Sequence, residues 1–361
     1  MKMSKKYALT ALAFASALTL AGNAAAFDGW HVENATTIPG KGSGWDYVAL
    51  DQQHHHLFIG HRKEGLQVFD TTTNKVVKVI EGTAAAGSNG ALLMPEFDLG
   101  ISNNQDGTVT PFKLSTLEAK PPIKLGTDLD TSHYDSATKR VVVNMGGEVG
   151  GTDLIVLQAP ELNIVGKIRV PAKSPEHAEA DGKGNFYLTA RDIDTVFRLD
   201  TSTLKITASW KTPGCGQTTG LTLDAAHDRI FLGCRGRGET PPTFAVMNAT
   251  TGAVIYKSEI GGGNDEVVYD PDLKRVFLSN GINAVLNVFE QVDVDNYKPV
   301  DAMGTRAGVR TMAIDAKTKK IYAVASEGSA DYTKKVLTAV SPYYANTFFD
   351  NKFTVLTITK D

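Results

Sequence analysis

Acidic side chains stand at one recurring position of this sequence, which makes that position the first place to look for chemistry. In GGGNDEVVYDPDLKRVFLSNG (261–281), Asp265 and Glu266 directly precede the apolar run VVY, where a strand is expected to begin. The turn-like segment DPDLKR and a second apolar run, VFL, complete a predicted β-hairpin. The two carboxylates either bind a ligand or are solvated residues of a loop, and repetition of the pattern would favour the first interpretation.

The hairpin pattern occurs seven times at a nearly constant spacing. Each copy has four alternating residues, an anchor residue, a short turn and a basic-plus-apolar run, as in RTMAIDAKTKKIYAV. The anchors, 40 to 46 residues apart, are Asp51, Pro95 in a degenerate copy, Asp135, Asp181, Asp224, Asp270 and Asp315. A second pair of strands lies between anchors, as in LQVFDTTTNKVVKVI, so each unit holds about four short strands. Seven such units without helical periodicity predict an all-β fold, a seven-bladed β-propeller with four-stranded blades.

The last unit contains only three predicted strands, ending with FTVLTITKD. A ring with an open edge is prone to aggregate, so a fourth strand must come from elsewhere. The segment GWHVENATTIPG near the N-terminus resembles the fourth strands of other units. We therefore expect residues 30–39 to complete the seventh blade beside residues 353–360.

The position five residues before each anchor is expected to face the central channel. The residues there are Asp46, Gly90, Asp130, Glu176, Thr219, Asp265 and Arg310. A core does not require four carboxylates and one arginine around one opening, although such acids can also be solvated or pair with Arg310. We expect them to converge on one polar cavity, and the predicted ligand-binding residues are Trp45, Asp46, Asn89, Asp130, Glu176, His177, Gln217, Asn264, Asp265 and Arg310.

Oxygen ligands in this ring suit a hard divalent cation, Ca²⁺ or Mg²⁺, and the candidate metal ligands are Asp46, Glu176 and Asp265. Propellers of the gluconolactonase type place a metal on similar groups, where it polarises a lactone carbonyl. No GxSxG, HExxH, phosphate-binding loop or CxxCH motif is present in the sequence, so nucleophilic catalysis has no support. Two hypotheses follow: a non-enzymatic binding protein and, as the alternative, a metal-dependent hydrolase of the lactonase type.

The first 26 residues have the pattern of a Sec-type signal peptide. Three lysines precede an apolar run that is too short to span a bilayer, and NAAA before Phe27 provides a cleavage site after Ala26. The expected domains are thus a signal peptide, 1–26, and one propeller, 27–361. No other segment approaches the ~20 apolar residues of a membrane span. We expect an exported, periplasmic monomer that binds a small molecule or an envelope protein.

Removal of the signal would leave 34 basic and 40 acidic residues. This mildly acidic balance disfavours nucleic acid as a partner, because phosphate backbones are bound by clustered basic residues. The only notable basic cluster, Arg235-Gly-Arg237, is interpreted as a solvated loop.

The two cysteines, Cys215 and Cys234, have no CxxC spacing, and an oxidising compartment favours a disulfide between them. The hairpin register would place Cys234 opposite Thr219, so the bond requires the chain before Thr219 to fold back over the blade.

Three successive units, CGQTTGLTLDAAHDRIFLGCR, GGGNDEVVYDPDLKRVFLSNG and GVRTMAIDAKTKKIYAVASE, resemble blades of the YVTN/YncE-like bacterial β-propeller proteins. The resemblance covers essentially the whole chain after the signal, although literal Y-V-T-N tetrads are absent. It implies a secreted propeller. It implies no particular reaction, because the family has no single catalytic motif.

Overall fold

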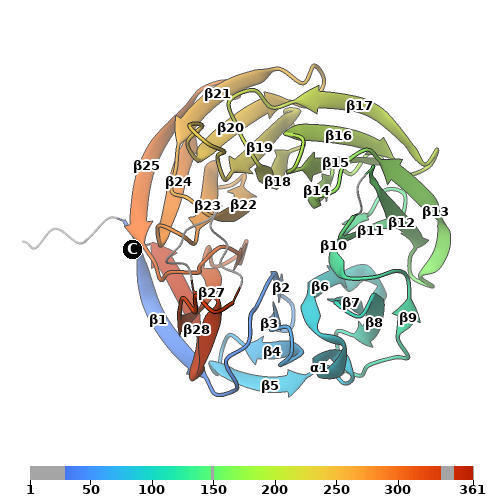
Figure 1. The fold of residues 1–361 in the computed structure, drawn as a ribbon, viewed down its shortest axis with the longest axis vertical. Coiled ribbons are helices and arrows are strands. Elements are labelled where there is room, and N and C mark those ends of the chain that lie inside the picture. The colour runs from blue at the N-terminus through green and yellow to red at the C-terminus, as the bar shows by residue number, and fades with distance from the viewer. Residues whose placement is uncertain (1–28, 148–149, 335–344, 361) are drawn as a thin grey trace, which may run out of the picture.

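The computed structural model describes residues 29–147, 150–334 and 345–360, so the predicted signal peptide lies outside the described residues. The strands form seven four-stranded antiparallel sheets. Figure 1 shows these sheets as blades that radiate from a central axis. The predicted all-β, seven-bladed propeller is therefore confirmed.

Each of the first six blades is formed by four consecutive strands, numbered from the axis outwards. Blade one contains β2 (Val48–Asp51), β3 (His56–Gly60), β4 (Leu66–Asp70) and β5 (Lys75–Val79); blade two β6 (Ser88–Met94), β7 (Leu99–Asn104), β8 (Thr108–Lys113) and β9 (Ile123–Lys124); blade three β10 (Leu129–Asp135), β11 (Arg140–Met145), β12 (Thr152–Gln158) and β13 (Asn163–Val170). Blade four contains β14 (Pro175–Ala180), β15 (Asn185–Ala190), β16 (Thr195–Asp200) and β17 (Lys205–Lys211); blade five β18 (Thr218–Asp224), β19 (Arg229–Cys234), β20 (Thr243–Asn248) and β21 (Val254–Glu259); blade six β22 (Asn264–Asp270), β23 (Arg275–Asn280), β24 (Val285–Gln291) and β25 (Tyr297–Gly304).

The seventh blade combines the two ends of the chain. Its order is β26 (Met312–Ile314), β27 (Ile321–Ser329), β28 (Thr347–Lys360) and β1 (Trp30–Ile38). Strand β1 runs antiparallel to β28, with Trp30 opposite Lys360 and Ile38 opposite Phe353. The predicted closure by residues 30–39 is confirmed, and β1 covers the outer edge of β28 that would otherwise be open.

The anchor aspartates fix the first turn of each blade. The Asp270 Oδ1 atom accepts a hydrogen bond from the Leu273 amide at 2.9 Å, and Asp315 Oδ1 accepts one from the Lys317 amide at 2.8 Å. Such Asx turns give most of the hairpins the same start, and in blade five the Asp224 carboxylate accepts a hydrogen bond from the His227 ring instead. Blade two, which has Pro95 in place of the aspartate, makes the turn with the short 3₁₀ helix η1 (Pro95–Phe97) instead.

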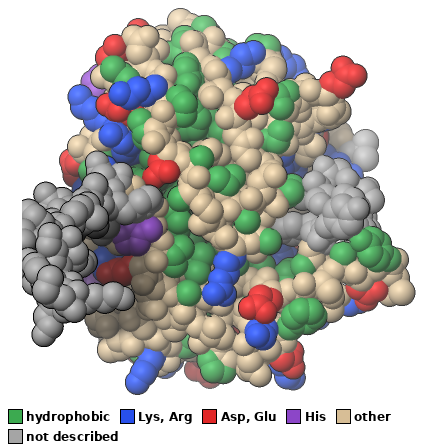
Figure 2. Space-filling view, turned by 90° about the vertical axis from the view of Figure 1, so that its left-hand side faces the viewer, with side chains coloured by type: hydrophobic (Ala, Val, Ile, Leu, Met, Phe, Trp, Pro, Cys, Tyr) green, Lys and Arg blue, Asp and Glu red, His purple; other side chains and the backbone are tan. Residues whose placement is uncertain are grey.

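The buried core lies between neighbouring blades and consists of seven apolar clusters. The single α-helix among the described residues is α1 (Thr83–Ala86), on the outer side of blade two. None of the described helices is long and apolar enough to cross a bilayer. On the side of the molecule shown in Figure 2, acidic and basic side chains are interspersed over the described surface.

The predicted disulfide between Cys215 and Cys234 is confirmed, with a Cα–Cα distance of 5.3 Å. The expected register is off by one residue, because Cys234 lies opposite Thr218 rather than Thr219. The cause is a β-bulge between Thr218 and Gly220, which the repeat spacing does not reveal. The disulfide ties the segment before β18 to the end of β19.

Candidate functional site

Arg310 connects ring residues from opposite ends of the chain. Its Nη1 atom lies 2.7 Å from Asp265 Oδ2, its Nη2 atom lies 3.3 Å from Asp46 Oδ1, and Nη2 also donates to the Trp45 carbonyl at 2.7 Å. Asp46 and Arg310 lie just before β2 and β26, the innermost strands of blades one and seven, and Asp265 is in β22 of blade six. The common offset from each anchor thus brings these three predicted site residues into contact at the axis.

Three further arginines bind the ring, and the sequence analysis did not identify them as site residues. Arg62 Nη2 lies 2.6 Å from Asp46 Oδ2, Arg191 Nε lies 3.1 Å from Glu176 Oε1, and Arg235 pairs with Asp265. Each arginine follows the second strand of its blade: β3, β15 or β19. The signal was present as an arginine shortly after the apolar run in FIGHR, LTAR and LGCR.

The interpretation of Arg235 as part of a solvated loop was wrong. Its side chain is 16% exposed, and burial lowers the pKa of its guanidinium to about 10. Arg237 does lie on the surface, where its Nη1 atom is 3.0 Å from Asp194 Oδ2. The two arginines differ because Arg235 directly follows β19 and points to the axis, as its bond to the Asn264 carbonyl shows.

The arginines lie closer to solvent than the carboxylates that bind them. The side chains of Arg62, Arg191, Arg235 and Arg310 are 16–32% exposed, whereas those of Asp46, Glu176 and Asp265 are 4–9% exposed. The buried acids therefore hold the guanidinium groups in fixed positions at the mouth. The sequence-based prediction included Arg310 among the ligand-binding residues and did not include Arg62, Arg191 or Arg235.

Asp130, the fourth ring carboxylate, is different from the other three. Within the described part of the chain it forms no ion pair and no side-chain hydrogen bond. Burial raises the pKa of Asp130 well above its usual value, the charges of Asp46 and Glu176 raise it further, and Arg62 and Arg310 oppose this shift. It is an acid held near like charges without a partner of its own.

A cavity of about 140 Å³ lies beside Asp130 in the channel. Its ionisable lining residues are Tyr47, Asp130, His133, His177 and Glu266. Glu266 Oε2 accepts a hydrogen bond from the Met312 amide at 2.5 Å, and burial raises the pKa of Glu266 to about 8. Burial, followed by the charges of the surrounding carboxylates, raises the pKa of Tyr47 well above its usual value.

The two histidines of this cavity are neutral at pH 7. Burial lowers the pKa of His177 to about 4 and that of His133 well below its usual value. His133 Nε2 accepts a hydrogen bond from the Ala178 amide at 3.1 Å, so the proton of the neutral ring is on Nδ1. The rings of His133 and His177 pack edge to face, with centroids 4.8 Å apart. His177 thus joins the predicted ring, whereas His133 was not predicted.

Four predicted ligand residues have other roles in the contacts seen here. The Trp45 indole packs edge to face against Phe348 and Phe353, with centroids 4.9 and 5.6 Å apart. Asn89 Nδ2 donates to the Leu129 carbonyl of the next blade, and Asn264 Nδ2 donates to the Glu266 and Ser279 carbonyls. The backbone amide of Gln217 donates to Asp194, on the rim of the ring. Asp130 and His177 line the cavity in the channel, and none of these four residues is among its lining residues.

Gly90 occupies the ring position of blade two and has a φ of 151°, which a residue with a side chain rarely adopts. A Cβ atom there would lie 2.9 Å from the Tyr47 Cβ atom. The glycine is thus required for close approach to Tyr47, and it also leaves space beside Asp130 in the cavity.

No group of three or more His, Cys, Asp or Glu side chains suited to a metal ion occurs in the described residues. The predicted metal ligands Asp46, Glu176 and Asp265 each bind an arginine instead. A guanidinium already occupies the coordination directions of these carboxylates, so the ring as built resembles an ion-pair network more than a cation site.

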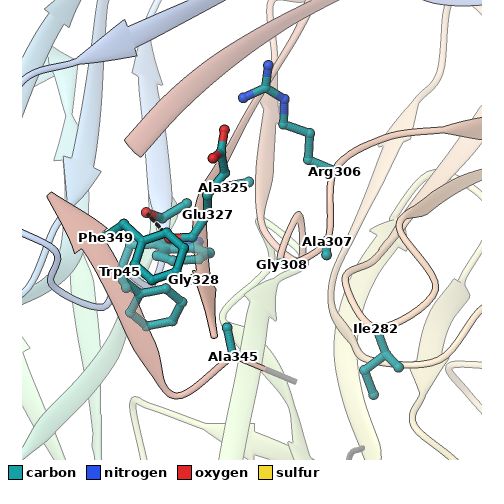
Figure 3. A pocket seen from close by; sticks show the side chains of 12 residues that line it. Trp45, Ile282, Arg306, Ala307, Gly308, Ala325, Glu327, Gly328, Ala345 and Phe349 are labelled. Atoms are coloured by element: carbon teal, nitrogen blue, oxygen red, sulfur yellow. Dashed lines mark hydrogen bonds between the residues drawn. The ribbon is translucent and has the colours of Figure 1, made fainter. Parts of the chain in front are cut away.

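A second, larger cavity of about 540 Å³ lies at the closing blade. Figure 3 shows Trp45 and Phe349 on one side, Ile282 and Ala307 on the other, and Arg306 above Glu327. Its lining is mostly apolar. The sequence did not predict this cavity, which is lined by the long strands β27 and β28 of the closing blade together with loops before β2, β24 and β26.

Comparison with known proteins supports the fold and nothing finer. No family model and no curated protein matches the chain, so the resemblance to YVTN/YncE-like propellers stays a prediction. A chain in the "Crystal Structure of Mitotic Checkpoint Complex" superposes with a TM-score of 0.69 over 92% of this chain and 95% of that chain, at 10% identity. As many as 1790 chains of solved structures match, so the fold is too widespread to select a function.

Proposed function

We propose that the protein is an exported, periplasmic binding protein that holds a small anionic molecule at the arginine-lined mouth of its channel. The observation that carries the proposal is the layered arrangement of Arg62, Arg191, Arg235 and Arg310 over buried carboxylates. A ligand that enters from solvent meets guanidinium groups first.

The ion pairs pre-organise these guanidinium groups for anion binding. Arginine side chains lose rotamer freedom when they bind a ligand, and the pairs with Asp46, Glu176 and Asp265 have already imposed that cost on folding. A planar guanidinium offers five N–H donors, so one that binds a carboxylate retains donors for a second anion. Carboxylate and phosphate groups fit this geometry best.

Export is supported by two independent features. The sequence begins with a signal-like segment, and the disulfide between Cys215 and Cys234 is typical of an oxidising compartment. The resemblance to secreted bacterial propellers agrees with both. Hydrolysis of a lactone with a metal, the alternative from the sequence, has no specific observation in its favour, because arginines bind its candidate ligands.

The proposal is tested by calorimetric titration of the mature chain with acetate, succinate and inorganic phosphate. Arg191→Gln removes one cation that binds a single carboxylate, and we expect at least a tenfold weaker affinity for succinate. Arg169→Gln is the control, because Arg169 is exposed and pairs with Asp153 in the outer strands of blade three, away from the ring. The affinity of this control variant for succinate should equal that of the unmodified chain.

The double variant Glu176→Gln/Arg191→Gln leaves no unpaired buried charge, and it keeps the test interpretable if the single variant fails to fold. It should bind succinate as weakly as Arg191→Gln does. Equal weakening by Arg169→Gln, no binding of any of the three anions, or binding only of an acidic protein partner would each overturn the proposal of a small anionic ligand.

A further inference from the structure

The cavity beside the ring has the opposite electrostatic character to the mouth. Its ionisable lining residues are Asp130, Glu266, Tyr47 and two neutral histidines, and no Lys or Arg is among the described residues that line it. The carboxylates of Asp130, Asp46, Glu176 and Glu266 all raise the pKa of the Tyr47 hydroxyl, after burial. With no cation in this lining and no partner for Asp130 in the described chain, a positive group in the cavity would stabilise the ionised form of this carboxylate.

We propose that this cavity binds a primary ammonium group on Asp130, so that the ligand is a small zwitterion with a carboxylate at the arginines and an amine in the channel. The chemical class is that of a short amino acid. The inference rests on the proposed function for its anionic half only. The ammonium subsite is carried by the cavity and by Asp130.

Asp130 is the carboxylate that remains for a ligand. Asp46, Glu176 and Asp265 bind arginines, and Glu266 accepts the Met312 amide from the neighbouring blade. An ammonium group beside Asp130 would satisfy a carboxylate that has no hydrogen bond or ion pair in the described chain. A charged pair of this kind is stronger in a partly dry cavity than in water.

Size and lining set the limits of the ligand. A volume of about 140 Å³ corresponds to about five water molecules at roughly 30 Å³ each. The site thus admits an ammonium group on a short carbon chain and not a bulky side chain. Tyr47, Thr131 and Ser132 line the same space, so the wall of the cavity beside Asp130 is polar.

The experiment compares single charges with zwitterions on the mature chain. Calorimetry would measure acetate, methylammonium, glycine, β-alanine and 4-aminobutyrate, the last three with increasing separation between amine and carboxylate. We expect at least one zwitterion to bind tenfold or more tightly than either single-charge compound. Asp130→Asn should abolish this advantage and leave acetate affinity within twofold.

Asp128→Asn is the matched control, because Asp128 is two residues away, exposed, and at a positive φ that asparagine also tolerates. It should keep the preference for the zwitterion. A preference that survives Asp130→Asn would overturn the inference.

The comparison of ligands on the unmodified chain decides between the two proposals even if Asp130→Asn does not fold. Acetate binding without any advantage for a zwitterion refutes the ammonium subsite and leaves the anion site standing. Methylammonium binding without acetate binding refutes the anion site and leaves the ammonium subsite standing. No binding by any of the five compounds refutes both.

Discussion

Replacement of Glu266 by glutamine should stabilise the protein at alkaline pH and have little effect at pH 4.5. Burial raises the pKa of Glu266 from 4.5 to about 8 in the folded chain. Between these two values the unfolded chain releases the proton and the folded chain keeps it, so stability falls as pH rises through this window and levels off above pH 8. At about 1.36 kcal/mol per pKa unit, the loss has an upper bound of about 5 kcal/mol, and hydration of the polar cavity reduces it to roughly 2–3 kcal/mol.

Glutamine keeps the oxygen that accepts the Met312 amide and has no proton to release, so it resembles the protonated acid. The assay is equilibrium urea unfolding of both proteins from pH 4.5 to 9, with the difference in unfolding free energy plotted against pH. Other titrating groups cancel in this difference. Glu239→Gln, at an exposed loop position, should give a flat difference curve. A flat curve for Glu266→Gln as well would show that Glu266 is ionised in the folded protein and that the cavity is not a site of raised carboxyl pKa.

Two further predictions concern the fold. Deletion of residues 27–40 removes β1, including the buried Trp30 and Ile38, and exposes the edge of β28; we expect loss of cooperative folding by circular dichroism, and a melting curve equal to that of the mature chain would refute closure by β1. The double substitution Cys215→Ser/Cys234→Ser opens a loop of 19 residues and should cost about 3 kcal/mol, whereas two reactive thiols in non-reduced protein would contradict the disulfide.

The repeat determined most of what the sequence could predict. The spacing of Asp51, Asp135 and the other anchors fixes the hairpin register, because each anchor accepts the hydrogen bonds of its own turn. Once register is fixed, rotational symmetry places the residue five positions earlier at the axis. Closure by residues 30–39 could be predicted because the last unit has three predicted strands where the other units have four.

The arginine layer could not be predicted in this way. Arg62, Arg191 and Arg235 lie after second strands, in loops whose lengths differ between blades. Arg235 reaches an acid of the neighbouring blade, and Arg310 reaches acids of the blades on both sides of it. Pairing across blades depends on how far each side chain reaches in three dimensions. A repeat alignment matches equivalent positions of the blades and does not show which side chains meet between them. The sequence-based metal hypothesis considered Asp46, Glu176 and Asp265 without the arginines that pair with them.

The departures of the ring from sevenfold symmetry carry the functional information. Arg310 of blade seven bonds to carboxylates of blades six and one on either side of it, and Arg62, Arg191 and Arg235 of blades one, four and five pair with ring carboxylates as well. Asp130 belongs to blade three, well away around the ring, and its neighbour in blade two is Gly90, which has no side chain to pair with it. A symmetric ring of paired charges would need no ligand. In this ring three carboxylates bind arginines, and Asp130 beside the small polar cavity has no partner in the described chain. A molecule with a carboxylate at one end and an amine at the other would bind the arginines with the first and Asp130 with the second.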